Sequence, residues 1–200
     1  MNTANASSNT KKLTGLAIFT AIIVVLQFVG SFIKFGMFSI SLVLVPIVVG
    51  AAIYGLAAGA YLGAVFGAVV LISGDASAFL TVSPIGTIVV VMLKGICAGY
   101  ASGAVFRLLE KKSRSLAALA SAIVCPVVNT GVFLLGCLVF FMPTITAWAS
   151  AMGFGGNVGR YMILGLVGWN FVFELAADVV ISHVILRLID AGRKSLNGEN

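Results

Sequence analysis

The stretch PIGTIVVVMLKGICAGYASGAVFR, residues 84–107, decides the fold of this chain. It is long enough to cross a bilayer as a helix, and it is almost wholly apolar except for Lys94 in its middle. Lys94 lies thirteen residues from Arg107 and ten from Pro84, which is about 20 Å and about 15 Å along a helix. In a hydrocarbon core about 30 Å thick, the Lys94 ammonium is therefore near the midplane. A charge at that depth costs about 2.5 kcal/mol or more, so a partner or a functional site has to offset it.

The composition of the whole chain agrees with a membrane protein. Of its 200 residues, 60% are hydrophobic and 9% are charged, and the mean hydropathy is +1.16. Soluble domains carry about 25% charged residues, so we predict an all-α membrane protein. The net charge of +6 does not indicate nucleic-acid binding, because Lys and Arg gather at helix ends. The three cysteines have no CxxC spacing, and we predict neither a metal site nor a cofactor.

Apolar segments of spanning length predict six transmembrane helices. Their ranges are 13–33, 38–54, 56–73, 84–107, 116–141 and 161–189. Longer loops are predicted at 74–83 and 143–160. The six helices form one solute-binding domain at 13–190, between a disordered tail at 1–12 and a polar tail at 191–200.

The distribution of basic residues predicts the orientation in the membrane. With six helices, both termini lie on one side, and nine Lys or Arg residues fall on that side. Only Lys34 and Arg160 fall on the opposite side, and Lys94 is inside the membrane. Loops rich in Lys and Arg stay in the cytoplasm, so both termini are predicted to be cytoplasmic. The loops at 74–83 and 143–160 then face outward, where a solute arrives.

Small residues recur every four positions on the third and fourth predicted helices. They are Gly55, Gly59, Gly63 and Gly67, followed by Gly95, Gly99 and Gly103. Such spacing lets two helix backbones approach closely in lipid. Plain packing inside the bundle explains these residues, and the alternative is a face that slides against a partner protein. Ala17 and Ala21 form a shorter version near the cytoplasmic end of the first helix.

Several polar residues lie at the depth of Lys94. Counted from the basic residues at the helix ends, Glu174 and Asn129 lie at a similar depth, and Asn170 shares a helix face with Glu174. One interpretation is a structural ion pair between Lys94 and Glu174; the other is a solute pocket in the outer half, between the last three helices and the outward loops. A neutralised Lys94 suits a neutral polar solute, whereas a Lys94 that Glu174 does not face favours a carboxylate.

These features together resemble a known family. The size, the six helices with both ends inside, the sequence AIFTA at 17–21 and the run SISLVLVPIVVGAAIYGLAAGAYLGAVFGAVV at 39–70 resemble the substrate-binding S component of an energy-coupling-factor (ECF) transporter, a prokaryotic vitamin-uptake system. The resemblance covers nearly the whole chain. Its specificity lies in the combination, because no part of it is a catalytic motif.

The resemblance implies a function and a set of sites. An S component of the prokaryotic cell membrane captures a vitamin and docks on a T component that carries two ATP-hydrolysing subunits. The docking contact would be Ala17 and Ala21, and the gate would be the loop 74–83 with Gly74, Asp75 and the following Pro84. The expected substrate-binding residues are Lys94, Asn129, Asn170, Glu174, Trp169, Lys34 and Arg160. Lys94 favours a carboxylate vitamin, with pantothenate first and folate or riboflavin behind it.

Two other classes of protein compete with this interpretation. A stand-alone secondary transporter or channel is disfavoured because the two halves show no inverted repeat. An intramembrane enzyme is disfavoured because the chain has no GxSG and no HExxH sequence. The chain also lacks a phosphate loop, so ATP hydrolysis would belong to partner subunits.

Overall fold

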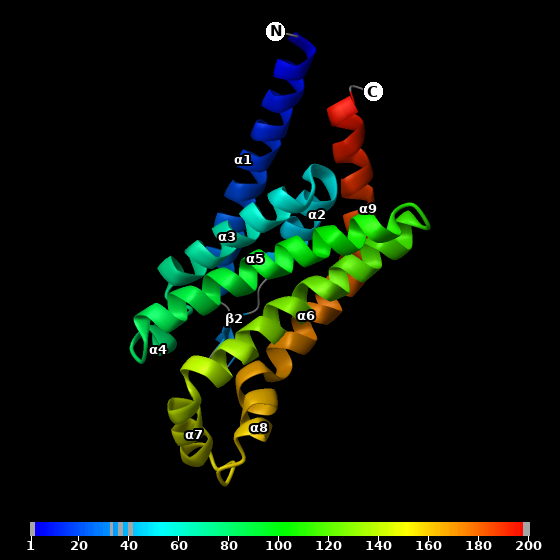
Figure 1. The fold of residues 1–200 in the computed structure, drawn as a ribbon. Helices are drawn as coiled ribbons and strands as arrows, with labels where there is room; N and C mark the ends of the chain where they lie inside the picture. Colours follow the sequence, from blue (N-terminus) through cyan, green and yellow to red (C-terminus); the bar gives the residue numbers. More distant parts are fainter. Residues whose placement is uncertain (1–2, 33, 36–37, 40–41, 198–200) are drawn as a thin grey trace.

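The computed structural model describes residues 3–32, 34–35, 38–39 and 42–197, and nearly all of these residues are helical. Figure 1 shows a bundle of long helices with shorter helices at one end. The helices are α1 (Thr3–Ser31), α2 (Leu44–Tyr54), α3 (Leu56–Ser73), α4 (Ser77–Leu80), α5 (Pro84–Leu109), α6 (Arg114–Phe140), α7 (Met142–Ala151), α8 (Val158–Tyr161), the π-helix η1 (Met162–Val167) and α9 (Gly168–Asn197). The all-helical prediction is thus confirmed for the described residues, apart from two strands of two residues each.

The start of the central helix α5 is set by Ser83 and Pro84, which follow the preceding loop. The Ser83 hydroxyl accepts a hydrogen bond from the Gly86 backbone N–H at 3.3 Å. Pro84 occupies the first turn, where its missing N–H costs nothing. Ser113 caps α6 in the same way, through the Leu116 N–H at 3.3 Å. These caps explain why the starts of both helices lie within two residues of their predicted positions.

The glycines of α3 and α5 bring these two helices into backbone contact. A Cβ on Gly59 would overlap the Gly99 carbonyl oxygen, and one on Gly63 would overlap the Gly95 carbonyl oxygen. The approach therefore requires glycine at both positions, and the predicted role of the glycine repeats in helix packing is confirmed for this pair. Helix α5 also packs extensively against α6, so it lies at the centre of the bundle.

The structure corrects the predicted chain path in two places between residues 143 and 189. The region 143–160, expected as a long loop, contains the helices α7 and α8. The expected helix 161–189 is not continuous, because a π-helical segment leads into Gly168. There the backbone adopts φ 34° and ψ −134°, a conformation that glycine reaches most readily.

The expected second helix is also shorter than its prediction. The strands β1 (Lys34–Phe35) and β2 (Phe38–Ser39) pair in antiparallel fashion, so the chain at 38–39 is extended, and α2 begins only at Leu44. Pro46 then lies in the first turn of α2, where proline is tolerated, and not in the middle of a longer helix.

Both ends of the chain are more helical than expected. Helix α1 begins at Thr3 and so includes most of the predicted disordered tail. No proline or glycine interrupts residues 3–14, and adding a residue to an existing helix costs little. Helix α9 continues to Asn197 into the second predicted tail.

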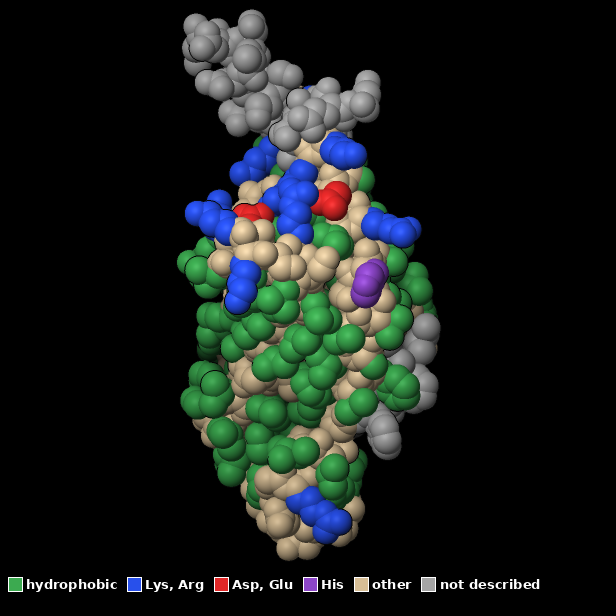
Figure 2. All heavy atoms as spheres, turned by 90° about the vertical axis from the view of Figure 1, so that its right-hand side faces the viewer, with side chains coloured by type: hydrophobic (Ala, Val, Ile, Leu, Met, Phe, Trp, Pro, Cys, Tyr) green, Lys and Arg blue, Asp and Glu red, His purple; other side chains and the backbone are tan. Residues whose placement is uncertain are grey.

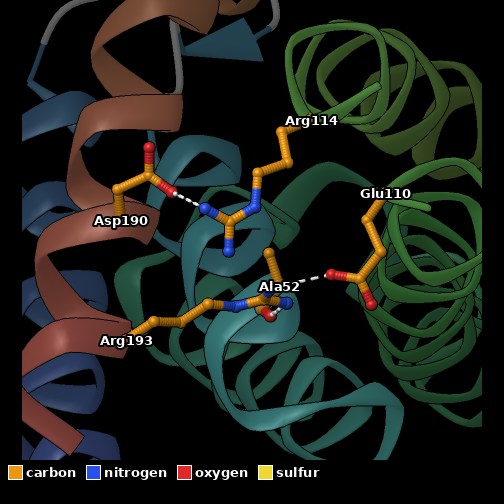
Figure 3. Close-up of polar contacts among 5 residues, drawn as sticks. All are labelled: Ala52, Glu110, Arg114, Asp190 and Arg193. Carbon is orange, nitrogen blue, oxygen red and sulfur yellow. Dashed lines mark hydrogen bonds and ion pairs between the residues drawn. The ribbon is translucent and has the colours of Figure 1, made fainter. Parts of the chain in front are cut away.

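A group of polar contacts secures α9 at the end where both termini lie (Figure 3). The Arg193 guanidinium donates to the Ala52 carbonyl oxygen at 2.8 Å and pairs with Glu110 at 2.7 Å. Arg114 pairs with Asp190 at 3.0 Å. These contacts join α9 to α2, to the end of α5 and to the start of α6, and they hold the C-terminal extension of α9 in place.

In the part of the chain that the structure describes, four helices are long and apolar enough to cross a membrane: Thr10–Ser31, Leu56–Ser73, Pro84–Leu109 and Arg114–Phe140. The ends of α1 and α9 that carry the termini lie at the same end of the molecule (Figure 1). Figure 2 shows a broad hydrophobic belt, with Lys and Arg gathered mainly at this terminal end. The six predicted crossings and their orientation remain predictions.

Candidate functional site

A cavity lies inside the bundle, among the parts of α1, α3, α5, α6 and α9 that are remote from the termini. Its volume is about 90 Å³. A single water needs about 10–15 Å³ on this scale, so the cavity holds several waters or a small organic group. A cavity between helices of a bundle is a common position for a ligand site. Its described lining residues are Gln27, Phe66, Val70, Asp75, Ala76, Phe79, Thr87, Val90, Val91, Lys94, Asn129, Thr130, Phe133, Phe141, Leu166, Val167, Asn170, Phe171 and Glu174.

Lys94 lies in the wall of this cavity between two aromatic rings. Its Nζ is 5.5 Å from the centre of the Phe66 ring and 5.6 Å from that of Phe133. Ring faces attract a cation at such distances. The carboxylates of Glu174 and Asp75 line the same cavity as Lys94. The sequence left open whether Glu174 faces Lys94, and the structure places both on one cavity.

Two asparagines line the cavity from the neighbouring helices α6 and α9. Asn129 is 6% exposed, and its Oδ1 is buried without a hydrogen-bond partner in the described structure. The Oδ1 of Asn170 is likewise buried without a hydrogen-bond partner among the described residues. A buried acceptor without a partner costs about 1–3 kcal/mol, and such a group in a folded protein requires an explanation. A solute with hydrogen-bond donors supplies one.

On α9, Asp178 and Ser182 follow Glu174 at intervals of four residues. Asp178 and Ser182 are 1% and 5% exposed, so this face of α9 is buried. Asp178 does not line the cavity, and its Oδ2 is another buried atom for which the described residues provide no partner. His183, the next residue in sequence, is exposed instead.

The loop between α3 and α4 is tied to α1 at the cavity. Asp75 Oδ2 accepts hydrogen bonds from Gln27 Nε2 at 2.5 Å and from the Ser31 hydroxyl at 2.7 Å. Because Gln27 and Asp75 both line the cavity, this loop forms part of its wall. We refer to the contacts of Gln27, Ser31 and Asp75 as the α1 latch.

Phenylalanine rings make up much of the remaining wall. Phe79 of α4 packs edge-on against Phe133 at 5.5 Å and against Phe141 at 5.0 Å between ring centres. Trp148 of α7 contacts the same ring at 5.5 Å. The short helices α4 and α7, which replace the expected outer loops, thus close one end of the cavity with aromatic side chains.

The other residues expected from the sequence lie elsewhere. Ala17 and Ala21 are exposed on α1, and Pro84 is exposed at the start of α5. Gly74 ends α3 with a φ of 84°. Arg160 is exposed in α8 and is not part of the cavity lining. The backbones of Lys34 and Trp169 lie in β1 and α9, and their side chains lie outside the described part of the structure.

Sequence reasoning brought together Lys94, Asn129, Asn170 and Glu174, and the structure places all four on the cavity. It missed Gln27 and the phenylalanines. Gln27 had a usable signal, because it is an isolated amide inside the apolar run of the first helix. The phenylalanines had none, since apolar residues also cover the lipid-facing surface.

Comparisons with known proteins identify the family. A sequence model described as "ECF transporter, substrate-specific component" matches residues 11–186. Comparisons with curated proteins and with solved structures gave no match. The matched range contains most of the chain and every described residue that lines the cavity. The chain therefore belongs to the family of substrate-specific components of ECF transporters.

Proposed function

We propose that this S component captures a small vitamin or vitamin precursor, and that the cavity between α3, α5, α6 and α9 binds it. The observation that carries the proposal is the pair of asparagine oxygens, on Asn129 and Asn170, that lack a partner among the described residues of an apolar bundle. Polar groups inside a membrane are costly and usually serve a site. A transport subunit without catalytic chemistry of its own accounts for this site better than an enzyme does.

The proposal includes six membrane crossings with both termini in the cytoplasm of a prokaryotic cell. The concentration of Lys and Arg at the terminal end supports this orientation (Figure 2). The cavity is lined by helix segments remote from that end, so it lies in the outer half of the membrane. The loop with Gly74 and Asp75, and Pro84 after it, then acts as the gate through which the solute arrives.

The partner in this proposal is a T component with two ATP-hydrolysing subunits, and α1 is the surface that docks on it. Helix α1 is the least buried of the four candidate spans, with 11% of its apolar window buried against 22–44% for the others. Ala17 and Ala21 are exposed there. Small residues let a partner helix approach closely where lipid gives no hydrophobic driving force.

Transport assays test this function. Liposomes that contain the chain, its T component and the two ATPase subunits should take up one member of a B-vitamin panel in an ATP-dependent way. The panel includes pantothenate, folate and riboflavin, the candidates from the sequence. Uptake by the chain alone would support a stand-alone secondary transporter instead, and the failure of every vitamin with the complete assembly would contradict the proposal.

A further inference from the structure

The charges on the cavity wall restrict what the cavity can bind. Among the described residues that line it, Lys94 is a cation, and Asp75 and Glu174 are carboxylates. The described part of the lining therefore has one more carboxylate than it has cations. Because α5, α3–α4 and α9 supply these three residues, the charge surrounds the cavity from several sides.

Lys94, the cation of the described lining, already has protein groups next to it. The Lys94 Nζ lies 5.5 Å from the centre of the Phe66 ring and 5.6 Å from that of Phe133, and it shares the cavity with the carboxylates of Asp75 and Glu174. A ligand carboxylate or phosphate near Lys94 would also face Glu174 and Asp75. Like charges brought together in a site cost binding energy, so such a ligand is disfavoured.

Two buried oxygen atoms of the wall indicate the same chemistry. The Oδ1 atoms of Asn129 and Asn170 accept hydrogen bonds and cannot donate them, and neither has a partner among the residues described. The lining phenylalanines provide flat apolar surfaces that bind aromatic rings and attract cations. Carbonyl oxygens, carboxylates and ring faces are complementary to donors and to positive charge.

We infer that the solute of this cavity carries no negative charge: it is an uncharged or cationic molecule with hydrogen-bond donors and an apolar or aromatic part. This inference rests on the proposed function and replaces the preference for a carboxylate vitamin that Lys94 suggested in the sequence. Of the three vitamins named above, riboflavin alone is uncharged, so it moves ahead of pantothenate and folate.

Matched ligand pairs that differ in charge test the inference by calorimetric titration of the purified full chain. Suitable pairs are riboflavin and flavin mononucleotide, pantothenol and pantothenate, and nicotinamide and nicotinate, with thiamine as a cation. We expect the ligand without negative charge to bind at least about tenfold tighter than its anionic partner in any pair that binds, because like charges repel. Tighter binding of the anionic member would overturn the inference and leave the vitamin-capture function intact. If no compound binds, both the inference on charge and the proposed vitamin-capture function are contradicted.

The variant Glu174→Gln provides a second test that keeps the size of the side chain. Removing this carboxylate leaves one cation, Lys94, and one carboxylate, Asp75, in the described lining. The preference for the uncharged member should therefore fall by about tenfold or reverse. An unchanged ratio within a pair would show that the wall charges do not select the ligand. The melting temperature of the ligand-free variant checks that it is folded.

Discussion

At the scale of single residues, Asn129 separates a structural from a functional explanation of the cavity. Its Oδ1 is buried and lacks a hydrogen-bond partner in the described structure. If the residue served stability, evolution of the apolar bundle would favour leucine at this position, since a buried acceptor without a partner is destabilising. If the residue serves solute binding instead, replacing it with an apolar residue should stabilise the ligand-free protein.

We therefore predict that Asn129→Leu stabilises the ligand-free protein by about 1 kcal/mol. Chemical denaturation in detergent measures the change. The matched control is Asn157→Leu, because Asn157 caps α8 by accepting from the Arg160 N–H at 3.0 Å. Loss of that cap should destabilise the protein by about 0.5–2 kcal/mol. A destabilised Asn129→Leu would mean that Asn129 is a structural residue.

The sequence located part of the site at this scale because depth can be counted along a helix. Lys94, Asn129 and Glu174 lie at similar distances from basic residues at their helix ends, and three parallel or antiparallel helices then place them together. The sequence could not assign the charge of the site. Asp75 joins the cavity through contacts with Gln27 and Ser31, 48 and 44 residues away, and no local pattern encodes that distance.

At the scale of elements, the glycine contact between α3 and α5 sets the positions of Phe66 and Lys94 on the cavity wall. We predict that Gly63→Ala destabilises the protein by about 1–3 kcal/mol, because its Cβ would overlap the Gly95 carbonyl oxygen. Thermal unfolding in detergent measures this effect. Gly131→Ala on α6 is the control, since its Cβ would meet nothing within 4 Å. Equal effects of the two substitutions would rule out the close approach.

The α1 latch is the second element with a testable role. In Ser31→Ala, Asp75 loses the hydrogen bond of 2.7 Å, so the loop between α3 and α4 should open more often. We expect the dissociation rate of a bound vitamin to rise by about fivefold, which corresponds to a net hydrogen bond of about 1 kcal/mol. Stopped-flow displacement measures this rate. Ser73→Ala is the control, because its hydroxyl donates within its own helix, to Val70 at 3.2 Å.

Unchanged dissociation from Ser31→Ala would show that the latch does not retain the solute. If Ser73→Ala increased the rate as much as Ser31→Ala, the effect would belong to the end of α3 and not to the latch.

The boundaries of elements were predictable where the chain carries its own signals. Helix α3 matches its prediction at both ends because Gly55 and Gly74 bound an apolar run. The sequence failed at 143–160, where glycines and polar residues suggested a loop. There α7 is stabilised by packing, since Ile145 and Ala149 are fully buried. A short helix that depends on such tertiary contacts has too few residues to show a clear hydrophobic periodicity in the sequence.

At the scale of the whole molecule, the solute site and the proposed docking surface are separate. Among the described lining residues, α1 contributes Gln27, whereas Ala17 and Ala21 lie exposed ten and six residues earlier. These separations are about 15 Å and about 9 Å along the helix. Binding and transport should therefore respond differently to changes in α1.

We predict that Ala17→Trp leaves vitamin affinity within about twofold of the wild type and abolishes ATP-dependent uptake, since a large side chain prevents close helix approach. Affinity is measured on the purified chain and uptake in liposomes with the complete transporter. Leu135→Trp on α6 is the control, because Leu135 is 63% exposed away from α1. Normal uptake by Ala17→Trp would remove this surface of α1 from the docking contact.

The central claim is that the cavity of this ECF substrate-specific component binds a vitamin, and the thermal unfolding of two proteins tests it directly. The wild type and Asn129→Leu are heated in detergent with each member of the B-vitamin panel. A ligand at about 100 times its dissociation constant stabilises the protein by about 2.7 kcal/mol, a shift of several degrees. We predict that one vitamin raises the melting temperature of the wild type and leaves that of Asn129→Leu unchanged. An equal shift in both proteins would contradict the claim, because the vitamin would then bind outside the cavity.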